Sequence, residues 1–211
     1  LKPVYAAYKV LAKARAHRGP LELELAEWIV EMDDLRRNIQ SVTQRERLDS
    51  HRLIEDFMIA ANVAAAETLI DRQAPCLFRV HDKPDPLRVE SLTGVLSEMG
   101  IKASASAITR PRQFTDLVRK AEGTPYATLV SELVLRSQSQ AIYHPENIGH
   151  FGLALARYAH FTSPIRRYSD LIVHRSLIAT LGLGEGGLPV EEHARLDRVA
   201  EHISMTERRA A

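Results

Sequence analysis

The stretch HFTSPIRRYSDLIVHRS, residues 160–176, decides how the fold of this chain is read. Thr162 or Ser163 can cap free backbone N–H groups, and Pro164 suits the first position of a helix, so a helix is predicted to begin here and to run to about Leu181. Three apolar residues recur at helical spacing and predict the face that packs into a core. They are Ile165, Tyr168 and Ile172.

Two arginines stand in the predicted first turn of this helix, where the backbone already presents positive charge. Arg166 and Arg167 would each cost about 0.3–1 kcal/mol at exposed positions there. Free N–H groups and two guanidinium groups together would suit a bound phosphate. The structural alternative is that Arg167 pairs with Asp170, and that Arg166 pairs with Asp170 or an acidic residue elsewhere. Spacing alone leaves both interpretations open.

Composition limits the classes of protein to consider. The 211 residues are 45% hydrophobic and 26% charged, with a formal net charge of +1. This balance argues against disorder and against a globally basic nucleic-acid coat, so any basic site must be local. The single cysteine, Cys76, excludes an internal disulfide and suits a reducing compartment. No apolar run is long enough to span a membrane and no signal peptide opens the chain, which predicts a cytoplasmic protein without membrane contact.

Hydrophobic periodicity predicts one α+β unit, predominantly helical, over residues 1–211. Helices are predicted over residues 3–17, 49–72, 86–99, 112–121 and 125–136, and from about 190 to the end. Strands are predicted over residues 21–30, 39–42 and 77–80, and around a turn within 141–155. The chain begins with leucine and stops at TERRAA inside the last predicted helix, so we expect it to be a piece of a longer protein.

The predicted helix over residues 49–72 carries polar residues beside apolar ones. His51, Glu55 and Asn62 lie on one stripe of its surface. A glutamate and an asparagine beside a packed face suggest hydrogen bonds to a defined partner, such as a ribose hydroxyl or a backbone group. The alternative is an ordinary amphipathic helix whose Asn62 satisfies a neighbouring loop.

A shorter segment, LFRVHDKPD at residues 77–85, places three cationic residue types at alternate positions. These are Arg79, His81 and Lys83. In an extended segment, alternate side chains point to one side. They would suit a phosphate backbone or form an ordinary solvated edge.

Two other kinds of site are disfavoured by spacing. Ser163, Asp170 and His174 are the residue types of a hydrolase triad, but no G-x-S-x-G elbow presents the serine, and the aspartate and histidine share one predicted helix. The nine histidines include no H-x-x-x-H or H-E-x-x-H pair. We therefore expect no metal site in this chain.

Four stretches resemble, in this order and spacing, the later part of the RNB catalytic domain of the ribonuclease II and ribonuclease R family. They are DSHRLIEDFMIAANVAAAE, LFRVHDKPD, AIYHPENIGHFGLAL and YAHFTSPIRRYSDLIVHR. The bacterial ribonuclease R branch is the most similar. The resemblance covers nearly the whole chain and is weakest around residues 21–45 and 101–125. It is most specific in SPIRRYSD with HFGLAL upstream.

This resemblance implies a processive hydrolytic exoribonuclease that degrades single-stranded RNA from its 3′ end with Mg²⁺, releasing nucleoside 5′-monophosphates. Arg166 matches the family's active-site arginine, which contacts phosphate. Glu55 matches the glutamate that binds the 3′-terminal nucleotide through its ribose. The other candidate RNA-binding residues are His51, Asn62, Arg79 and Arg167. We expect a monomer whose partner is the 3′ end of single-stranded RNA.

The chain departs from the family pattern in its metal ligands. The D-x-x-x-x-x-D-x-D-D cluster is absent, and Asp33–Asp34 and Asp82–Asp85 have the wrong spacing. Two-metal catalysis needs grouped carboxylates, so we expect the Mg²⁺ ligands upstream of Leu1 and expect the chain alone not to cleave RNA. Leu23 aligns with a phenylalanine that sandwiches the terminal base in part of the family. The family's flanking tyrosine, cold-shock domains and S1 domain are also absent.

The rival hypothesis is a catalytically silent RNB remnant that binds only RNA or a protein partner. The two hypotheses predict different sequence upstream of Leu1, with an aspartate cluster for the enzyme and none for the remnant.

Overall fold

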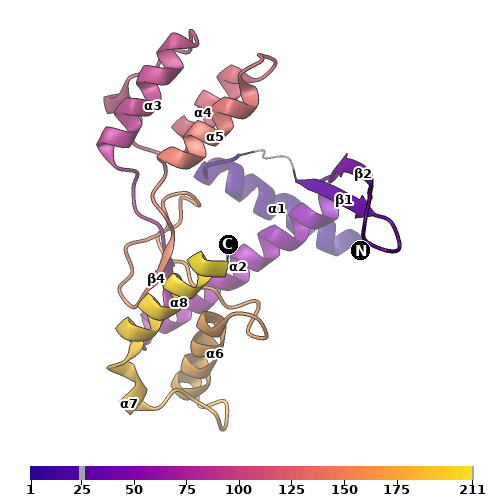
Figure 1. Cartoon of the computed structure of the whole chain (residues 1–211). Coiled ribbons are helices and arrows are strands. Elements are labelled where there is room, and N and C mark those ends of the chain that lie inside the picture. The colour runs from indigo at the N-terminus through magenta and orange to yellow at the C-terminus, as the bar shows by residue number, and fades with distance from the viewer. Residues whose placement is uncertain (24–26, 211) are drawn as a thin grey trace.

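The computed structural model describes residues 1–23 and 27–210 and is an α+β structure built mainly of helices, as predicted (Figure 1). The longer helices are α1 (Lys2–Arg18), α2 (Asp49–Asp71), α3 (Pro86–Glu98), α4 (Pro111–Ala121), α5 (Ala127–Ser137), α6 (Tyr168–Leu181) and α8 (Leu196–Ala210). The shorter ones are the 3-10 turn η1 (Ala105–Ala107) and α7 (Val190–His193). Two antiparallel pairs of strands are formed by β1 (Trp28–Met32) with β2 (Ile39–Gln44), and by β3 (Phe78–Val80) with β4 (Ile142–His144).

Helices α3, α4 and α5 pack into one body at the opposite end of the molecule from α6 and α7 (Figure 1). Asp85 starts α3, because its side chain accepts a hydrogen bond from the backbone N–H of Leu87 at 2.8 Å. The core of this body contains fully buried Leu96, Phe114 and Val130.

Helix α2 crosses the middle of the molecule and carries a second core. The small, buried Ala65 and Ala66 allow β3 and α6 to pack against it, with Val173 contributed by α6. A third cluster joins β4, α6 and α8 through Tyr143, Ile172 and Leu196. Together these cores hold the segment between β4 and α6 against α2. No helix in the described ranges is long and apolar enough to cross a membrane.

The predicted start of α6 was wrong, because the helix begins at Tyr168 rather than at Pro164. The residues before it form a turn, in which the N–H groups of Arg166 and Arg167 donate to the carbonyl of Ser163 at 3.3 and 3.1 Å. The two arginines therefore lie in a turn that precedes the helix. We call residues 163–167 the arginine turn.

The predicted apolar face of this region was also wrong in part. Ile172 is 1% exposed, as expected for the core, but Ile165 is 102% exposed and Tyr168 is 49% exposed. Helical spacing aligns side chains only within a helix, and Ile165 lies in the turn outside it.

Three further expectations are corrected. The strand predicted over 21–30 is regular only from Trp28, while residues 21–23 have no regular structure and 24–26 lie outside the described residues. Of its apolar side chains, Leu21 and Leu23 are partly buried against the core of α3, α4 and α5, whereas Trp28, Ile29 and Val30 are exposed. The β1–β2 hairpin also exposes Met32, Ile39 and Val42. Within 141–155 only β4 forms a strand, and the terminal helix is divided into α7 and α8.

Candidate nucleic-acid interface

A groove of about 460 Å³ runs along α2 where this helix faces the segment between β4 and α6. We call it the central groove. It is lined by His51, Ile54, Glu55, Met58, Ile59, Asn62, Leu153, Tyr158 and Arg167. The structure thus brings together four of the six predicted site residues, namely His51, Glu55, Asn62 and Arg167. Arg79 and Arg166 do not line this groove.

Arg167 reaches the central groove while Asp170 holds its guanidinium group. Its Nε donates to Oδ2 at 2.9 Å, and its Nη2 donates to Oδ1 at 2.7 Å. Asp170 is fully buried and also accepts hydrogen bonds from the N–H of Ser163 and the hydroxyl of Ser169. Burial alone would raise the pKa of Asp170, but these hydrogen bonds, led by that from Arg167, hold the pKa below its ordinary value. The structural pairing considered for Arg167 is therefore present.

Arg166 has a different environment from its neighbour. Its side chain is exposed, and within the described residues it takes no part in the hydrogen-bonded group around Asp170. The pairing of Arg166 with Asp170 is therefore not formed. An exposed guanidinium beside a fixed one is suited to a phosphate that approaches the arginine turn.

Asn62 ties α2 to the segment that leads into the arginine turn. It is 2% exposed. Its Nδ2 donates to the hydroxyl of Tyr158 at 3.0 Å, and its Oδ1 accepts from the N–H groups of Phe161 and Thr162 at 2.9 and 3.2 Å. The alternative that Asn62 satisfies a neighbouring loop is therefore confirmed. Its role in RNA binding stays a prediction.

Glu55 lies between the central groove and a second, smaller pocket, and it lines both. Its carboxylate forms an ion pair with Arg47. His51, one turn earlier on α2, is exposed, and its Nδ1 accepts the backbone N–H of Leu48 at 3.2 Å. The side chain of His51 therefore helps to start α2 and also borders the groove.

Arg79 lies on β3, away from the central groove. Its side chain is 15% exposed and donates to Glu207 of α8 at 2.7 Å. Its guanidinium also lies 4.6 Å from the ring centroid of Tyr143. His81, two residues on, is buried. The alternative of an ordinary solvated edge was therefore wrong for Arg79 and His81, although Lys83 is exposed. The role of Arg79 in RNA binding stays a prediction.

Two histidines hold the 149–155 loop, which carries Leu153 into the central groove. The Nδ1 atom of His81 accepts the N–H of Gly152 at 2.8 Å, and the Nδ1 atom of His150 accepts the N–H of Leu153 at 3.2 Å. A Cβ atom on Gly152 would lie 3.0 Å from the His81 ring, so a larger residue here would require the ring to shift. Burial lowers the pKa of His81, and it lowers the pKa of His150 to about 3. Both imidazoles are therefore neutral acceptors.

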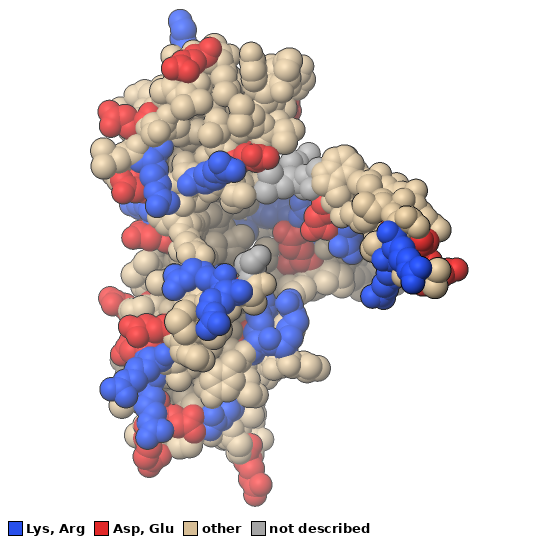
Figure 2. Space-filling view, viewed as in Figure 1, with Lys and Arg blue, Asp and Glu red and all other residues tan. Residues whose placement is uncertain are grey.

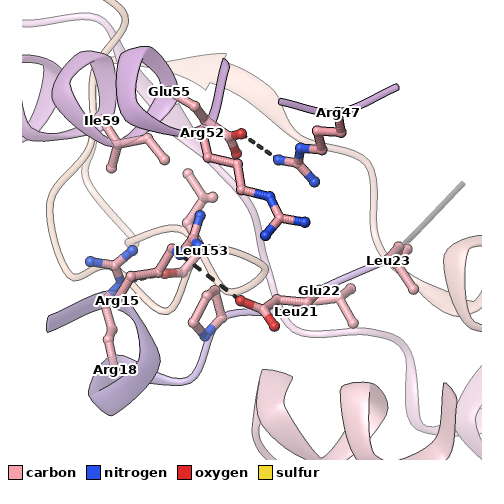
Figure 3. A pocket seen from close by; sticks show the side chains of 11 residues that line it. Arg15, Arg18, Leu21, Glu22, Leu23, Arg47, Arg52, Glu55, Ile59 and Leu153 are labelled. Carbon is pink, nitrogen blue, oxygen red and sulfur yellow. Dashed lines mark hydrogen bonds and ion pairs between the residues drawn. The ribbon is translucent and has the colours of Figure 1, made fainter. Parts of the chain in front are cut away.

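The second pocket, of about 230 Å³, adjoins the central groove and was not predicted (Figure 3). Four guanidinium groups line it, and we call it the arginine pocket. They belong to Arg15, Arg18, Arg47 and Arg52. The other lining residues are Pro20, Leu21, Glu22, Leu23, Glu55, Ile59 and Leu153. The sequence carried no signal for it, because these arginines come from two helices and the segment between β2 and α2.

The described residues do not fit a Mg²⁺ ion. A divalent cation of this kind is held by grouped oxygen ligands. No three His, Cys, Asp or Glu side chains in the described ranges converge on one point. The two carboxylates of the arginine pocket, Glu22 and Glu55, are already paired with arginines. The described residues therefore supply no metal-assisted step by themselves.

Comparison with known proteins gives consistent matches. The model of the RNB domain family matches residues 1–182. Ribonuclease R of Escherichia coli (strain K12) is 41% identical over 220 residues, covering 100% of this chain and 27% of the relative. Ribonuclease R of Aquifex aeolicus (strain VF5) is 40% identical over 208 residues, covering 99% and 29%. The structure of Mycoplasma genitalium RNase R in complex with ribose methylated single-stranded RNA has a TM-score of 0.85 at 24% identity, covering 98% of this chain and 33% of that one. The chain thus spans about a third or less of the length of these relatives.

Proposed function

Because this chain belongs to the RNB domain family, we propose that it forms the part of a 3′-to-5′ exoribonuclease that holds the 3′ end of single-stranded RNA. The observation that carries this proposal is the central groove, which gathers a polar stripe of α2 and Arg167 along one partly apolar floor. Single-stranded RNA requires such a combination, with cations for the backbone and apolar or polar surfaces for bases and sugars.

The arginine turn contacts phosphate in this proposal. Hydrolysis increases negative charge on the oxygens of the scissile phosphate, and a guanidinium placed there stabilises that charge. The exposed Arg166 has this role, as the family resemblance implies. Arg167 contacts a neighbouring phosphate from the position that Asp170 gives it. Asn62 acts indirectly, since it anchors the backbone of Phe161 and Thr162 before the turn.

Glu55 binds the terminal ribose in this proposal. A carboxylate accepts hydrogen bonds from sugar hydroxyls, and the 2′-hydroxyl is the group that distinguishes RNA from DNA. Glu55 lies on the same stripe as His51, which borders the groove nearer the start of α2. The ion pair with Arg47 fixes the orientation of the Glu55 carboxylate at the border of the two pockets.

The finer properties of the enzyme are part of the same proposal. We propose processive hydrolysis that releases nucleoside 5′-monophosphates, with Mg²⁺ held by carboxylates outside these 211 residues. We also propose that the chain is the C-terminal part of an RNB catalytic domain, in a monomeric cytoplasmic protein. The greater length of the matching relatives supports the view that the chain is part of a longer protein.

A time course on a 5′-labelled single-stranded RNA with Mg²⁺ tests the proposal. It compares the protein as its gene encodes it with the 211-residue chain. We expect stepwise shortening by the gene product and none by the chain. Shortening by the chain alone would show that its own residues hold the metal, and would contradict the proposal that the metal ligands lie outside these 211 residues. RNA binding without shortening by the gene product would favour the catalytically silent remnant.

A further inference from the structure

The arginine pocket carries more positive charge than its own acidic residues neutralise. Glu22 lies 3.9 Å from Arg15, and Glu55 is paired with Arg47. Buried Asp56, which does not line the arginine pocket, lies 3.2 Å from Arg15. Arg52 and Arg18 form ion pairs with none of these carboxylates, and Arg52 points into the space between the Glu22 and Glu55 side chains (Figure 3).

Apolar side chains in the walls of the arginine pocket strengthen the electrostatic effect of its positive charge. Leu21, Ile59 and Leu153 line it beside the guanidinium groups and reduce contact with water. Burial lowers the pKa of Arg18, and Arg15 lowers it further although Asp56 acts in the opposite direction. An anion in this space would relieve the repulsion among the arginines and would accept their hydrogen bonds. Acidic and basic side chains also face the hollow beside α2 on the molecular surface (Figure 2).

The position of the arginine pocket beside the central groove indicates which anion it binds. Glu55, Ile59 and Leu153 line both the central groove and the arginine pocket, whereas Arg167 lines only the groove. An RNA end that has its phosphates at the arginine turn and its last ribose at Glu55 therefore has its 3′ substituent at the arginine pocket.

We propose that the arginine pocket binds a phosphate on the 3′ end of RNA, so that 3′-phosphorylated RNA is a substrate class of this protein. This inference rests on the proposed function. A terminal phosphate carries up to two negative charges and offers three acceptor oxygens, which match a group of guanidinium forks. A 3′-hydroxyl end would leave the pocket to water or free anions.

The chemistry of the first turnover follows. Water adds its oxygen to the phosphorus of the last phosphodiester, and the bond from phosphorus to the O3′ atom of the preceding nucleotide breaks. That O3′ takes a proton and becomes the new 3′-hydroxyl. The terminal 3′-phosphate is untouched, so the first product is a nucleoside 3′,5′-bisphosphate, and later products are 5′-monophosphates.

The test compares two RNAs of one sequence, ending in a 3′-hydroxyl or a 3′-phosphate, with the protein as its gene encodes it. We expect both RNAs to be degraded, and a nucleoside 3′,5′-bisphosphate to appear first from the phosphorylated RNA. Arg52→Gln should lower the ratio of kcat/KM for the phosphorylated RNA to that for the hydroxyl RNA by about tenfold, the loss of one charged hydrogen bond. Arg52→Lys, which keeps the charge, should lower the ratio less.

Arg136→Gln is the matched control, because Arg136 is exposed on α5 and lines neither pocket. It should leave the ratio unchanged. Resistance of the phosphorylated RNA, or an unchanged ratio in Arg52→Gln, would overturn the inference.

A direct binding measurement distinguishes failure of this inference from failure of the proposed function. If neither RNA is shortened, the proposed function fails, but binding affinity still tests whether the arginine pocket binds a 3′-phosphate. Tighter binding of a nucleoside 3′,5′-bisphosphate than of the 5′-monophosphate supports phosphate binding by the pocket, and equal affinity refutes it.

Discussion

Arg167 and Asp170 form a two-point ion pair in which the carboxylate is fully buried and the guanidinium reaches the central groove. The Asp170 carboxylate also accepts a hydrogen bond from the N–H of Ser163, so this one aspartate fixes both ends of the arginine turn. The arginine turn is therefore tied to the core by this buried carboxylate.

Asp170→Asn should lower the free energy of unfolding by about 3 kcal/mol, because Arg167 would lose its ionised partner while remaining largely buried. Urea unfolding with both proteins measures this change. Asp34→Asn, at an exposed position in the β1–β2 turn, is the control and should have little effect. Equal midpoints for Asp170→Asn and the original protein would contradict the anchoring role.

Arg166→Ala should reduce kcat by about 10²–10³ in the active protein and change the Kd for RNA only a few-fold. In the proposed role, Arg166 is one backbone contact among several in the ground state but meets the developing charge in the transition state. Single-turnover cleavage and equilibrium RNA binding separate the two effects. Equal losses in both would count against a transition-state role.

Glu55→Ala should weaken discrimination between RNA and DNA ends. In the proposed role of Glu55, removing its carboxylate deprives the 2′-hydroxyl of the terminal ribose of its acceptor. The measurement is the ratio of cleavage rates for RNAs that end in a ribonucleotide or a deoxyribonucleotide. Glu67→Ala, at an exposed position on the same helix, should keep the original ratio. An unchanged ratio in Glu55→Ala would refute ribose binding.

Asn62→Ala should destabilise the protein by about 2 kcal/mol, because the N–H groups of Phe161 and Thr162 would lose their acceptor. Cleavage should also slow, since this backbone leads into the arginine turn. Tyr158→Phe removes only the hydrogen bond from Asn62 Nδ2 and should cost less. Thermal unfolding and cleavage rates measure both effects. The same stability in Asn62→Ala as in the original protein would exclude the anchoring role.

Acidification should destabilise the fold through its buried imidazoles. Burial lowers the pKa of His150 and of His160 to about 3, whereas unfolded imidazoles titrate near 6.5. The unfolded state therefore binds more protons below pH 6.5, and stability falls from that pH toward 3 by roughly 1 kcal/mol per pH unit for each histidine. Above pH 6.5 both states are neutral and this contribution is constant.

Urea midpoints at pH 7.5, 6 and 5 measure this pH dependence. His150→Gln should flatten it, whereas His17→Gln, at an exposed position on α1, should not. A flat profile in the original protein between pH 6 and 5 would contradict neutral burial of the imidazoles.

Local signals predicted several elements closely. Helices α2 and α3 have nearly the predicted bounds, because caps and apolar periodicity act within a few residues of chain. Helix α1 ends where Gly19 adopts a left-handed conformation with φ of 68°, which is a local C-terminal signal that glycine provides. The start of α6 could not be predicted in this way. A proline and two hydroxyl residues favour a helix start, but the buried Asp170 binds Ser163 and holds the turn outside the helix.

By itself the sequence determined the family, the helical class and the polar stripe of α2, since each depends on residues close together along the chain. Only the tertiary structure decided that Asn62 serves the loop before α6, that Ile165 is exposed, and that Arg79 pairs with Glu207. It alone assembled the arginine pocket from α1, the segment before α2, and α2 itself. These outcomes depend on which distant segments pack together, and burial and charge pairing across such contacts leave no pattern in the spacing of neighbouring residues.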